Sequence, residues 1–256
     1  LGEGRVLIAG GESRKQGTLQ SLKSAFIVDA LDPNDVQVGS DALAMKEART
    51  GHMATRLSDG RGVLTGGREL VPGAAGPQDH TYSDTVEVFD PVEGFFAYVN
   101  DAQGNRLTLG GGRFGHSATV MAADTEMGAE RLMIAGGMDG TAPNPSVELL
   151  TLMGTGSTLQ GSVSVGAASL SVGAIFHASA PFANEVYPNG AVLLSGGYPT
   201  IADAEPNGAL PSNPSGAVEM WTVEQGVLTR KCTSNLVTPR GFHTVSTGSR
   251  RAFFVG

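Results

Sequence analysis

A pattern that returns at regular intervals is the strongest constraint on the fold of this chain. It begins with Arg49-Thr50-Gly51-His52, continues through an apolar run to Gly66-Gly67, and ends in a segment that contains Val86-Glu87. The pattern recurs roughly every sixty residues, which indicates an architecture built from one repeated supersecondary unit. Later copies contain His116, His177 and His243, an initial copy opens at Gly4, and the paired glycines begin at Gly10, Gly66, Gly136 and Gly196.

Each copy has the composition of short antiparallel strands. Runs such as Leu132-Met133-Ile134 are continuously apolar, which is typical of strands that are buried on both faces. The turn signal Ser58-Asp59-Gly60 separates the first two strands of the second copy. The predicted strands are 52–58, 61–66, 84–90 and 94–99 in the second copy, 115–122, 130–136, 146–153 and 158–165 in the third, and 175–183, 189–195, 216–223 and 226–230 in the fourth.

Composition and charge exclude several classes of function. The chain of 256 residues has a net charge of −8 and no stripe of Lys and Arg, so we expect no nucleic-acid partner. Cys232 is the single cysteine, which excludes an intrachain disulfide and a cluster of thiolates around zinc. Residues 161–183 carry no formal charge, but they are rich in Gly, Ser and Ala and contain Pro181. We therefore predict no membrane span. We also predict no cofactor.

The repeated residues resemble those of the kelch family of β-propellers. The resemblance rests on Arg-x-x-His, on the apolar run that ends in Gly-Gly, and on the Val-Glu strand, which one copy follows with Phe89-Asp90-Pro91. It covers nearly the whole chain, although the fourth copy has Ala174 in place of the Arg and the only Trp, Trp221, lies in the Val-Glu strand. The resemblance implies an all-β, kelch-like β-propeller with four-stranded antiparallel blades.

We therefore expect residues 1–256 to form a single β-propeller domain. The sequence starts and stops inside apolar strands, and kelch propellers have more blades than the copies present, so we expect an incomplete ring in this chain. The expected complete blades are 52–99, 115–165 and 175–230, with a partial blade at 4–40 and another at 243–256.

Four histidines occupy the same position in successive copies, namely His52, His116, His177 and His243. A ring of imidazoles around a central channel is one arrangement that holds a metal ion. A side chain that recurs once per blade more often satisfies the same backbone group in each blade, and the symmetry would keep neighbouring histidines too far apart to share one ion. We favour the structural role and predict no metal site.

The repeated arginines, Arg49, Arg113 and Arg240, allow two interpretations. Three guanidinium groups that converge on one mouth would suit a carboxylate or phosphate ligand. Alternatively, each arginine pairs with an acidic group of its own or the next blade, because a carboxylate on a buried strand needs a partner. We favour this second interpretation, in which the partners are the repeated carboxylates Glu87, Glu148 and Glu219.

The segments after the paired glycines vary most in length and composition, namely 12–23, 68–83, 138–145 and 198–215. Such loops emerge on one face of a propeller, where they change without disturbing the sheets. We expect the functional face to be built by the loops 68–83 and 198–215, together with the connections 100–114 and 231–242. The candidate interaction residues in the loops are Glu69, Asp79, His80, Tyr82, Asp139, Tyr198, Asp203 and Glu205.

Few titratable groups converge in these loops, which favours a contact surface over a catalytic pocket. We predict a non-enzymatic protein-protein interaction or assembly module, with a protein partner within a larger assembly and an extracellular or cell-surface location. The alternative is a carbohydrate-directed oxidase or a glycan-binding propeller of the galactose-oxidase-like type, for which a glycan would be the partner.

Overall fold

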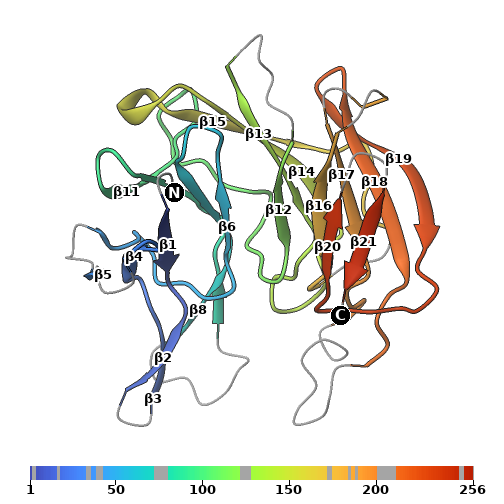
Figure 1. Ribbon diagram of the computed structural model, residues 1–256, viewed down its shortest axis with the longest axis horizontal. Coiled ribbons are helices and arrows are strands. Elements are labelled where there is room, and N and C mark those ends of the chain that lie inside the picture. The colour runs from blue at the N-terminus through green and yellow to red at the C-terminus, as the bar shows by residue number, and fades with distance from the viewer. Residues whose placement is uncertain are drawn as a thin grey trace.

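The chain folds into consecutive antiparallel sheets, one for each copy of the repeat (Figure 1). The structure is a computed structural model, and it describes residues 1, 4–15, 18–32, 36–38, 43–71, 80–121, 128–171, 175–183, 186–187, 190–200, 212–247 and 251–255. The all-β prediction is confirmed, because strands make up nearly all regular structure within these ranges and the named helical element is the short 3-10 turn η2 (Gly156–Thr158).

Within the described residues, three sheets contain four strands each. In every one of them the chain runs from strand to neighbouring strand, so each sheet is a meander of one copy. The second sheet contains β6 (Met53–Arg56), β7 (Gly62–Thr65), β10 (Val86–Asp90) and β11 (Phe95–Tyr98); the third contains β12 (Ser117–Val120), β13 (Glu130–Ala135), β14 (Val147–Met153) and β15 (Gln160–Val165); the fourth contains β16 (Ala178–Phe182), β17 (Ala191–Ser195), β18 (Ala217–Glu224) and β19 (Val227–Asn235).

The strands predicted for these three copies are all present, and β19 continues past the expected end at residue 230 to Asn235. The copies at the two ends contribute smaller sheets. The first sheet contains β1 (Arg5–Ala9), β4 (Ala25–Asp29) and β5 (Val36–Val38), and the last is the pair β20 (Thr244–Thr247) and β21 (Ala252–Val255).

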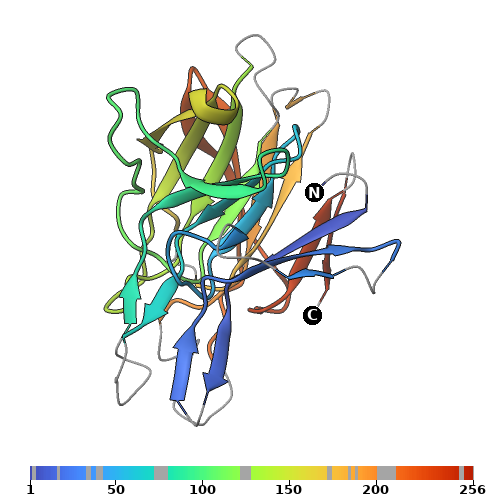
Figure 2. The same cartoon turned by 90° about the vertical axis from the view of Figure 1, so that its left-hand side faces the viewer.

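Two hairpins extend the chain after the paired glycines, at positions where the sequence indicates only loops. They are β2 (Glu12–Lys15) with β3 (Thr18–Ser21), and β8 (Arg68–Leu70) with β9 (His80–Tyr82). Both hairpins project from the same end of the sheets, below them in Figures 1 and 2. The face that was predicted to carry variable loops therefore also carries regular structure.

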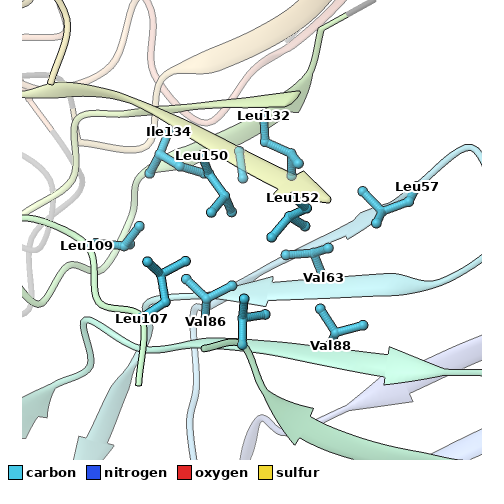
Figure 3. Packing of buried hydrophobic residues seen from close by; sticks show 12 residues of the cluster. Leu57, Val63, Val86, Val88, Leu107, Leu109, Leu132, Ile134, Leu150 and Leu152 are labelled. Atoms are coloured by element: carbon cyan, nitrogen blue, oxygen red, sulfur yellow. The ribbon is translucent and has the colours of Figure 1, made fainter. Parts of the chain in front are cut away.

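The sheets pack face to face, so that the core consists of apolar layers between successive sheets. Alternate residues of β13 point in opposite directions: Leu132 and Ile134 pack toward the second sheet, and Met133 packs toward the fourth. Figure 3 shows the layer between the second and third sheets, with Val63 and Val86 facing the leucines of the third sheet. Burial on both faces explains the continuous apolar runs in the sequence, and each such side chain contributes about 1.5–3 kcal/mol by leaving water.

The first strands of four successive sheets, β6, β12, β16 and β20, lie side by side. Side-chain hydroxyls join them across the gaps, since Thr55 donates to the carbonyl of Ala118 at 3.1 Å and Thr119 donates to Ser179 at 2.7 Å. The sheets therefore meet along their first strands.

Candidate functional site

The repeated glycines of one copy bind the repeated arginine segment of the next copy. In three of the four pairs, the N–H of the second glycine donates to the backbone carbonyl of the arginine that begins the following Arg-x-x-His. We call this contact, together with the side chains around it, the inter-sheet clamp. Its bonds are Gly11 to Arg49 at 2.9 Å, Gly67 to Arg113 at 2.8 Å and Gly197 to Arg240 at 2.9 Å.

The first glycine is required by both conformation and space in three of the pairs, at Gly10, Gly66 and Gly196. Gly66 has φ +60°, a left-handed conformation that side chains disfavour. A Cβ atom at this position would lie 2.6 Å from the carbonyl oxygen of Arg113 and 2.6 Å from Cε1 of His116. The glycine therefore lets two successive sheets approach each other at the clamp.

Histidines complete the clamp through hydroxyl groups. His116 Nε2 lies 2.9 Å from Thr65 Oγ1, and His243 Nε2 lies 2.8 Å from Ser195 Oγ. Thr65 and Ser195 each stand immediately before a pair of glycines. The third sheet has an alanine at that position, and His177 Nε2 instead lies 2.8 Å from Ser117 Oγ.

The environment of the histidines favours neutral imidazole. Burial, with Arg49 nearby, lowers the pKa of His52 to about 4. Burial also lowers the pKa of His116 well below its ordinary value, with additional repulsion from Arg113. The described part of the chain contains no group of three or more His, Cys, Asp or Glu side chains placed to hold a metal ion.

The repeated arginines and glutamates form buried ion pairs in two copies. Arg49 contacts Glu87 at 2.6 Å with both side chains almost fully buried, and Arg113 contacts Glu148 in the same way. Each arginine also donates a hydrogen bond from Nη1 to the carbonyl of the first glycine of its own sheet. The bond from Arg49 to Gly66 is 2.7 Å long. The expected pairing is therefore present in the second and third sheets, where it holds the arginine segment in place.

A backbone contact fixes the glutamate in all three complete sheets. The carboxylate accepts a hydrogen bond from the N–H of the residue that lies three positions before the Arg position. These bonds run from Lys46 to Glu87 at 2.8 Å, from Gly110 to Glu148 at 2.9 Å and from Ser171 to Glu219 at 2.7 Å.

The fourth copy replaces the arginine, and a tryptophan donates instead. Ala174 lies outside the described residues. Glu219 accepts a hydrogen bond from Trp221 Nε1 at 2.9 Å, and Arg230 lies 3.6 Å from the same carboxylate. The single Trp of the chain therefore supplies a donor that the other copies take from arginine. Arg240, in the last copy, donates from Nε to the carbonyl of Thr238 at 3.3 Å.

Glu47 is a partner of Arg49 that the repeat did not indicate. It lies 3.0 Å from Arg49 and accepts hydrogen bonds from the hydroxyls of Ser83 at 2.8 Å and Tyr98 at 3.1 Å. Burial alone would raise the pKa of Glu47, but hydrogen bonds, led by that from Ser83, lower it. Burial raises the pKa of the neighbouring Glu87. Arg49, Glu47 and Glu87 thus form one hydrogen-bonded network between the first and second sheets, in which Arg49 Nε has no partner among the described residues.

The residue before each repeated histidine is the position with the most unusual backbone. In the second and third copies it is Gly51 and Gly115, and in the fourth and fifth it is Phe176 and Phe242. All four have positive φ, with 54° for Phe176 and 50° for Phe242. A phenylalanine in this conformation is strained by about 1–2 kcal/mol.

Backbone hydrogen bonds to the preceding copy accompany the left-handed conformation in the last two copies. The N–H of Phe176 donates to the carbonyl of Gly115 at 2.9 Å, and the N–H of Phe242 donates to the carbonyl of Phe176 at 3.3 Å. These bonds continue from the third copy to the last. Glycine meets this requirement without strain in the earlier copies, so the fold itself does not require an aromatic residue here.

The two strained phenylalanines belong to a cluster that we call the aromatic patch, made of Phe114, Phe176, Tyr198 and Phe242. Phe176 stacks on Phe242 at 4.5 Å and meets Phe114 edge-on at 5.2 Å, and Tyr198 lies 5.5 Å from Phe242. Phe114 and Tyr198 are buried, whereas Phe242 is 56% exposed. Arg68 places its guanidinium 3.8 Å from the centre of the Phe114 ring.

The aromatic patch lies at the end of the sheets that carries the hairpins. Tyr198 follows a pair of glycines directly, and Arg68 begins β8. The patch therefore joins the loops after the second strands to the segments that enter the first strands. The sequence signal that would have revealed it is the change from Gly to Phe at one fixed position of Arg-x-x-His.

The predicted interaction residues have different surroundings. Glu69, His80 and Tyr82 lie on the β8–β9 hairpin, and the ring of Tyr82 packs against Gly140. Asp139 closes a tight turn, and hydrogen bonds from Thr141 lower its pKa. Tyr198 is part of the aromatic patch, and Asp79, Asp203 and Glu205 lie outside the described residues.

Among the described residues there is no helix with the length and apolarity needed to cross a membrane. No protein-family model matches the chain, and it matches no curated protein.

Proposed function

We propose that the successive sheets are blades of a kelch-like β-propeller and that the chain is a protein-binding module. The meander order of each sheet, the side-by-side first strands and the recurring clamp support the propeller. In such an arrangement each blade contacts only its neighbours, and one fixed set of residues joins every adjacent pair.

The observation that carries the binding function is the exposed and strained Phe242. Its φ of 50° costs free energy that a glycine would avoid, as Gly51 and Gly115 do in the equivalent positions. Backbone strain of this kind clusters at functional sites in proteins. Large aromatic side chains beside an arginine, with a partly exposed surface, have the composition of the energetic centre of a protein interface.

The surroundings of the aromatic patch support a protein as the partner. The β2–β3 and β8–β9 hairpins lie at the same end of the sheets as the patch, so several segments are available there to contact a partner. We place the partner within a larger assembly, at a cell surface.

The experiment compares binding by the full chain with binding by two variants. Phe242→Gly removes the aromatic side chain and gives this position the residue that the second and third copies have. Phe253→Ala removes a phenyl group that is exposed to a similar degree, 58%, on β21. Partners captured from the source cells are quantified for all three proteins, together with the free energy of unfolding.

We expect Phe242→Gly to lower the affinity for a captured partner about tenfold or more. Its unfolding free energy should change by less than about 1 kcal/mol, because the relief of strain offsets the lost stacking. Phe253→Ala should bind like the parent. A partner that binds Phe242→Gly as tightly as the parent would move the interaction surface elsewhere.

A further inference from the structure

The first sheet has a free edge at the position where each complete sheet has its first strand. In the second, third and fourth sheets, the strand before the paired glycines lies between two hydrogen-bonded neighbours, whereas β1 pairs only with β4 in the described part of the chain. The N–H and C=O groups along such an edge are available to pair with an additional strand. The first sheet can therefore grow by one strand at the edge of β1.

Strand β6 of the second sheet lies beneath this free edge. The first strands lie side by side in the order β6, β12, β16 and β20 (Figure 1), and no first strand precedes β6 among the described residues. Strand β1 packs on β7, since a Cβ atom at Gly62 would lie 3.6 Å from Leu7 Cδ2. A strand paired with the free edge of β1 would therefore lie on β6, as β6 lies beside β12.

The exposure of β6 shows that this position is open. Ala54 pairs with Leu64, whose side chain packs toward the first sheet, so Ala54 and Arg56 face the same way. Both residues are exposed, whereas Ala118, the equivalent of Ala54 on β12, is only 9% exposed because β6 lies beside it. We call the free edge of β1, together with Ala54 and Arg56, the strand groove. Strand β1 gives the groove a length of five residues.

Hydroxyl groups join the other first strands, and the same contact is available in the strand groove. Thr55 of β6 donates to the carbonyl of Ala118 on β12, and Thr119 of β12 donates to Ser179 of β16. The carbonyl of Ala54 holds on β6 the place that the carbonyl of Ala118 holds on β12. A Ser or Thr on the added strand, at the position equivalent to Thr55, can therefore donate to β6.

The outer face of the first sheet is apolar. Val6 and Ile8 point away from the second sheet and are 48% and 53% exposed, and they pair across β4 with Val28 and Phe26. Phe26 stands where the second and third sheets have the buried glutamate that pairs with arginine. The groove thus has no equivalent carboxylate for an arginine, and apolar side chains beside Val6 and Ile8 would extend this face.

We propose that the strand groove binds an extended segment of a partner polypeptide in which Ser or Thr alternates with an apolar residue. The segment pairs antiparallel with β1 and becomes the first strand of the first sheet. Backbone hydrogen bonds to β1 hold it, and the alternation sets which side chains face β6. This inference does not rest on the proposed interaction at the aromatic patch, because the two surfaces share no residue.

The test uses a synthetic peptide of residues 115–122. This peptide contains the β12 sequence Ser117-Ala118-Thr119-Val120 and therefore the required alternation. Its control is the same peptide with Ala118→Pro, because proline lacks the N–H and does not fit inside a sheet. Each peptide is titrated into the isotopically labelled full chain and followed by two-dimensional NMR. We expect the first peptide to shift the amide signals of β1 and of Ala54 until they saturate, and the proline peptide to leave them unchanged.

Two variants of the chain assign the binding to the strand groove. Ile8→Lys should weaken the binding about fivefold or more, because a charge replaces an apolar contact between strands. Ile8 is half-exposed, and the amide spectrum of the variant reports whether it folds. Val255→Lys is the matched control, since Val255 is 66% exposed on the edge strand β21 of the last sheet, and it should leave the affinity unchanged. The proposal is overturned if the peptide shifts no β1 signal, if the proline peptide binds equally well, or if Ile8→Lys binds like the parent.

Discussion

At the scale of the residue, the structure depends on charged groups that are removed from water. The Arg113 and Glu148 side chains are almost fully buried and contact each other. Burial lowers the pKa of Arg113, against the attraction of Glu148. Such a pair adds little stability compared with an apolar replacement, but loss of one member leaves the other charge buried and alone.

We predict that Glu148→Ala lowers the free energy of unfolding by about 3–5 kcal/mol, measured by urea denaturation. The control is Glu224→Ala. Glu224 forms an exposed pair with Lys231 at 2.6 Å, and its loss should cost less than about 1 kcal/mol. Equally small effects of the two substitutions would show that the Arg113–Glu148 pair is exposed to solvent.

The histidines predict how stability depends on pH. An unfolded His52 binds its proton near pH 6.5, whereas the folded pKa is about 4. Between these values the unfolded state binds more protons, so the free energy of unfolding falls as the pH is lowered. His116, whose folded pKa is also lowered, acts in the same direction.

The comparison is urea unfolding of the parent and of His52→Gln at pH 7.5 and 5.5. The loss of stability on acidification should be smaller in the variant by about 1 kcal/mol, because Gln does not titrate. Identical losses in the two proteins would mean that His52 is accessible to water and titrates normally when folded.

At the scale of the element, the contact between neighbouring sheets depends on the first glycine of each pair. The fold accepts a left-handed residue at many turns, but at Gly66 a Cβ atom would also meet the backbone of the next copy at 2.6 Å. A substitution here therefore acts on two sheets, whereas one at an open turn acts on a single backbone conformation.

We predict that Gly66→Ala destabilises the chain by about 2–5 kcal/mol, from left-handed strain and steric overlap together. The matched control is Gly60→Ala in the same sheet. Gly60 has φ +91° and nothing within 4 Å of an added Cβ, so only strain of about 1–2 kcal/mol applies. Thermal unfolding that gave the same cost for both would contradict the close contact at Gly66.

Much of this element structure follows from the sequence, because strands buried on both faces leave continuous apolar runs. The strands of the second to fourth sheets were predicted on this basis. The Arg49–Glu87 pair was predicted because both residues recur in the repeat. The β8–β9 hairpin does not, since Arg68–Leu70 and His80–Tyr82 are partly exposed and lack a regular apolar pattern. Their pairing depends on contacts that local sequence does not encode.

The candidate site shows the same division. The repeat indicated the histidines and arginines, because they return at the same position in successive copies. The aromatic patch depends on residues from three copies, and Phe242 departs from the glycine that stands in the second and third copies at its position. A repeat reveals what is constant, whereas this surface is formed where the copies differ.

At the scale of the whole molecule, the structure is a series of sheets with a separate apolar layer between each successive pair. Layers between the first and second, the second and third, and the third and fourth sheets contain Phe89, Leu150 and Trp221 respectively. Contacts are made mainly between neighbours, so the order of the sheets depends on inter-sheet contacts, among which the inter-sheet clamp joins the first copy to the second, the second to the third and the fourth to the fifth.

The most direct test of this account is hydrogen exchange at the amides of Gly11, Gly67 and Gly197 under native conditions. Each amide donates to the carbonyl of an arginine in the next copy, at 2.8 to 2.9 Å. If these bonds join the sheets, the three amides exchange as slowly as core amides such as that of Ile134, through cooperative unfolding. Exchange of these amides at the rate of an unstructured peptide, while the core amides stay protected, would contradict the clamp.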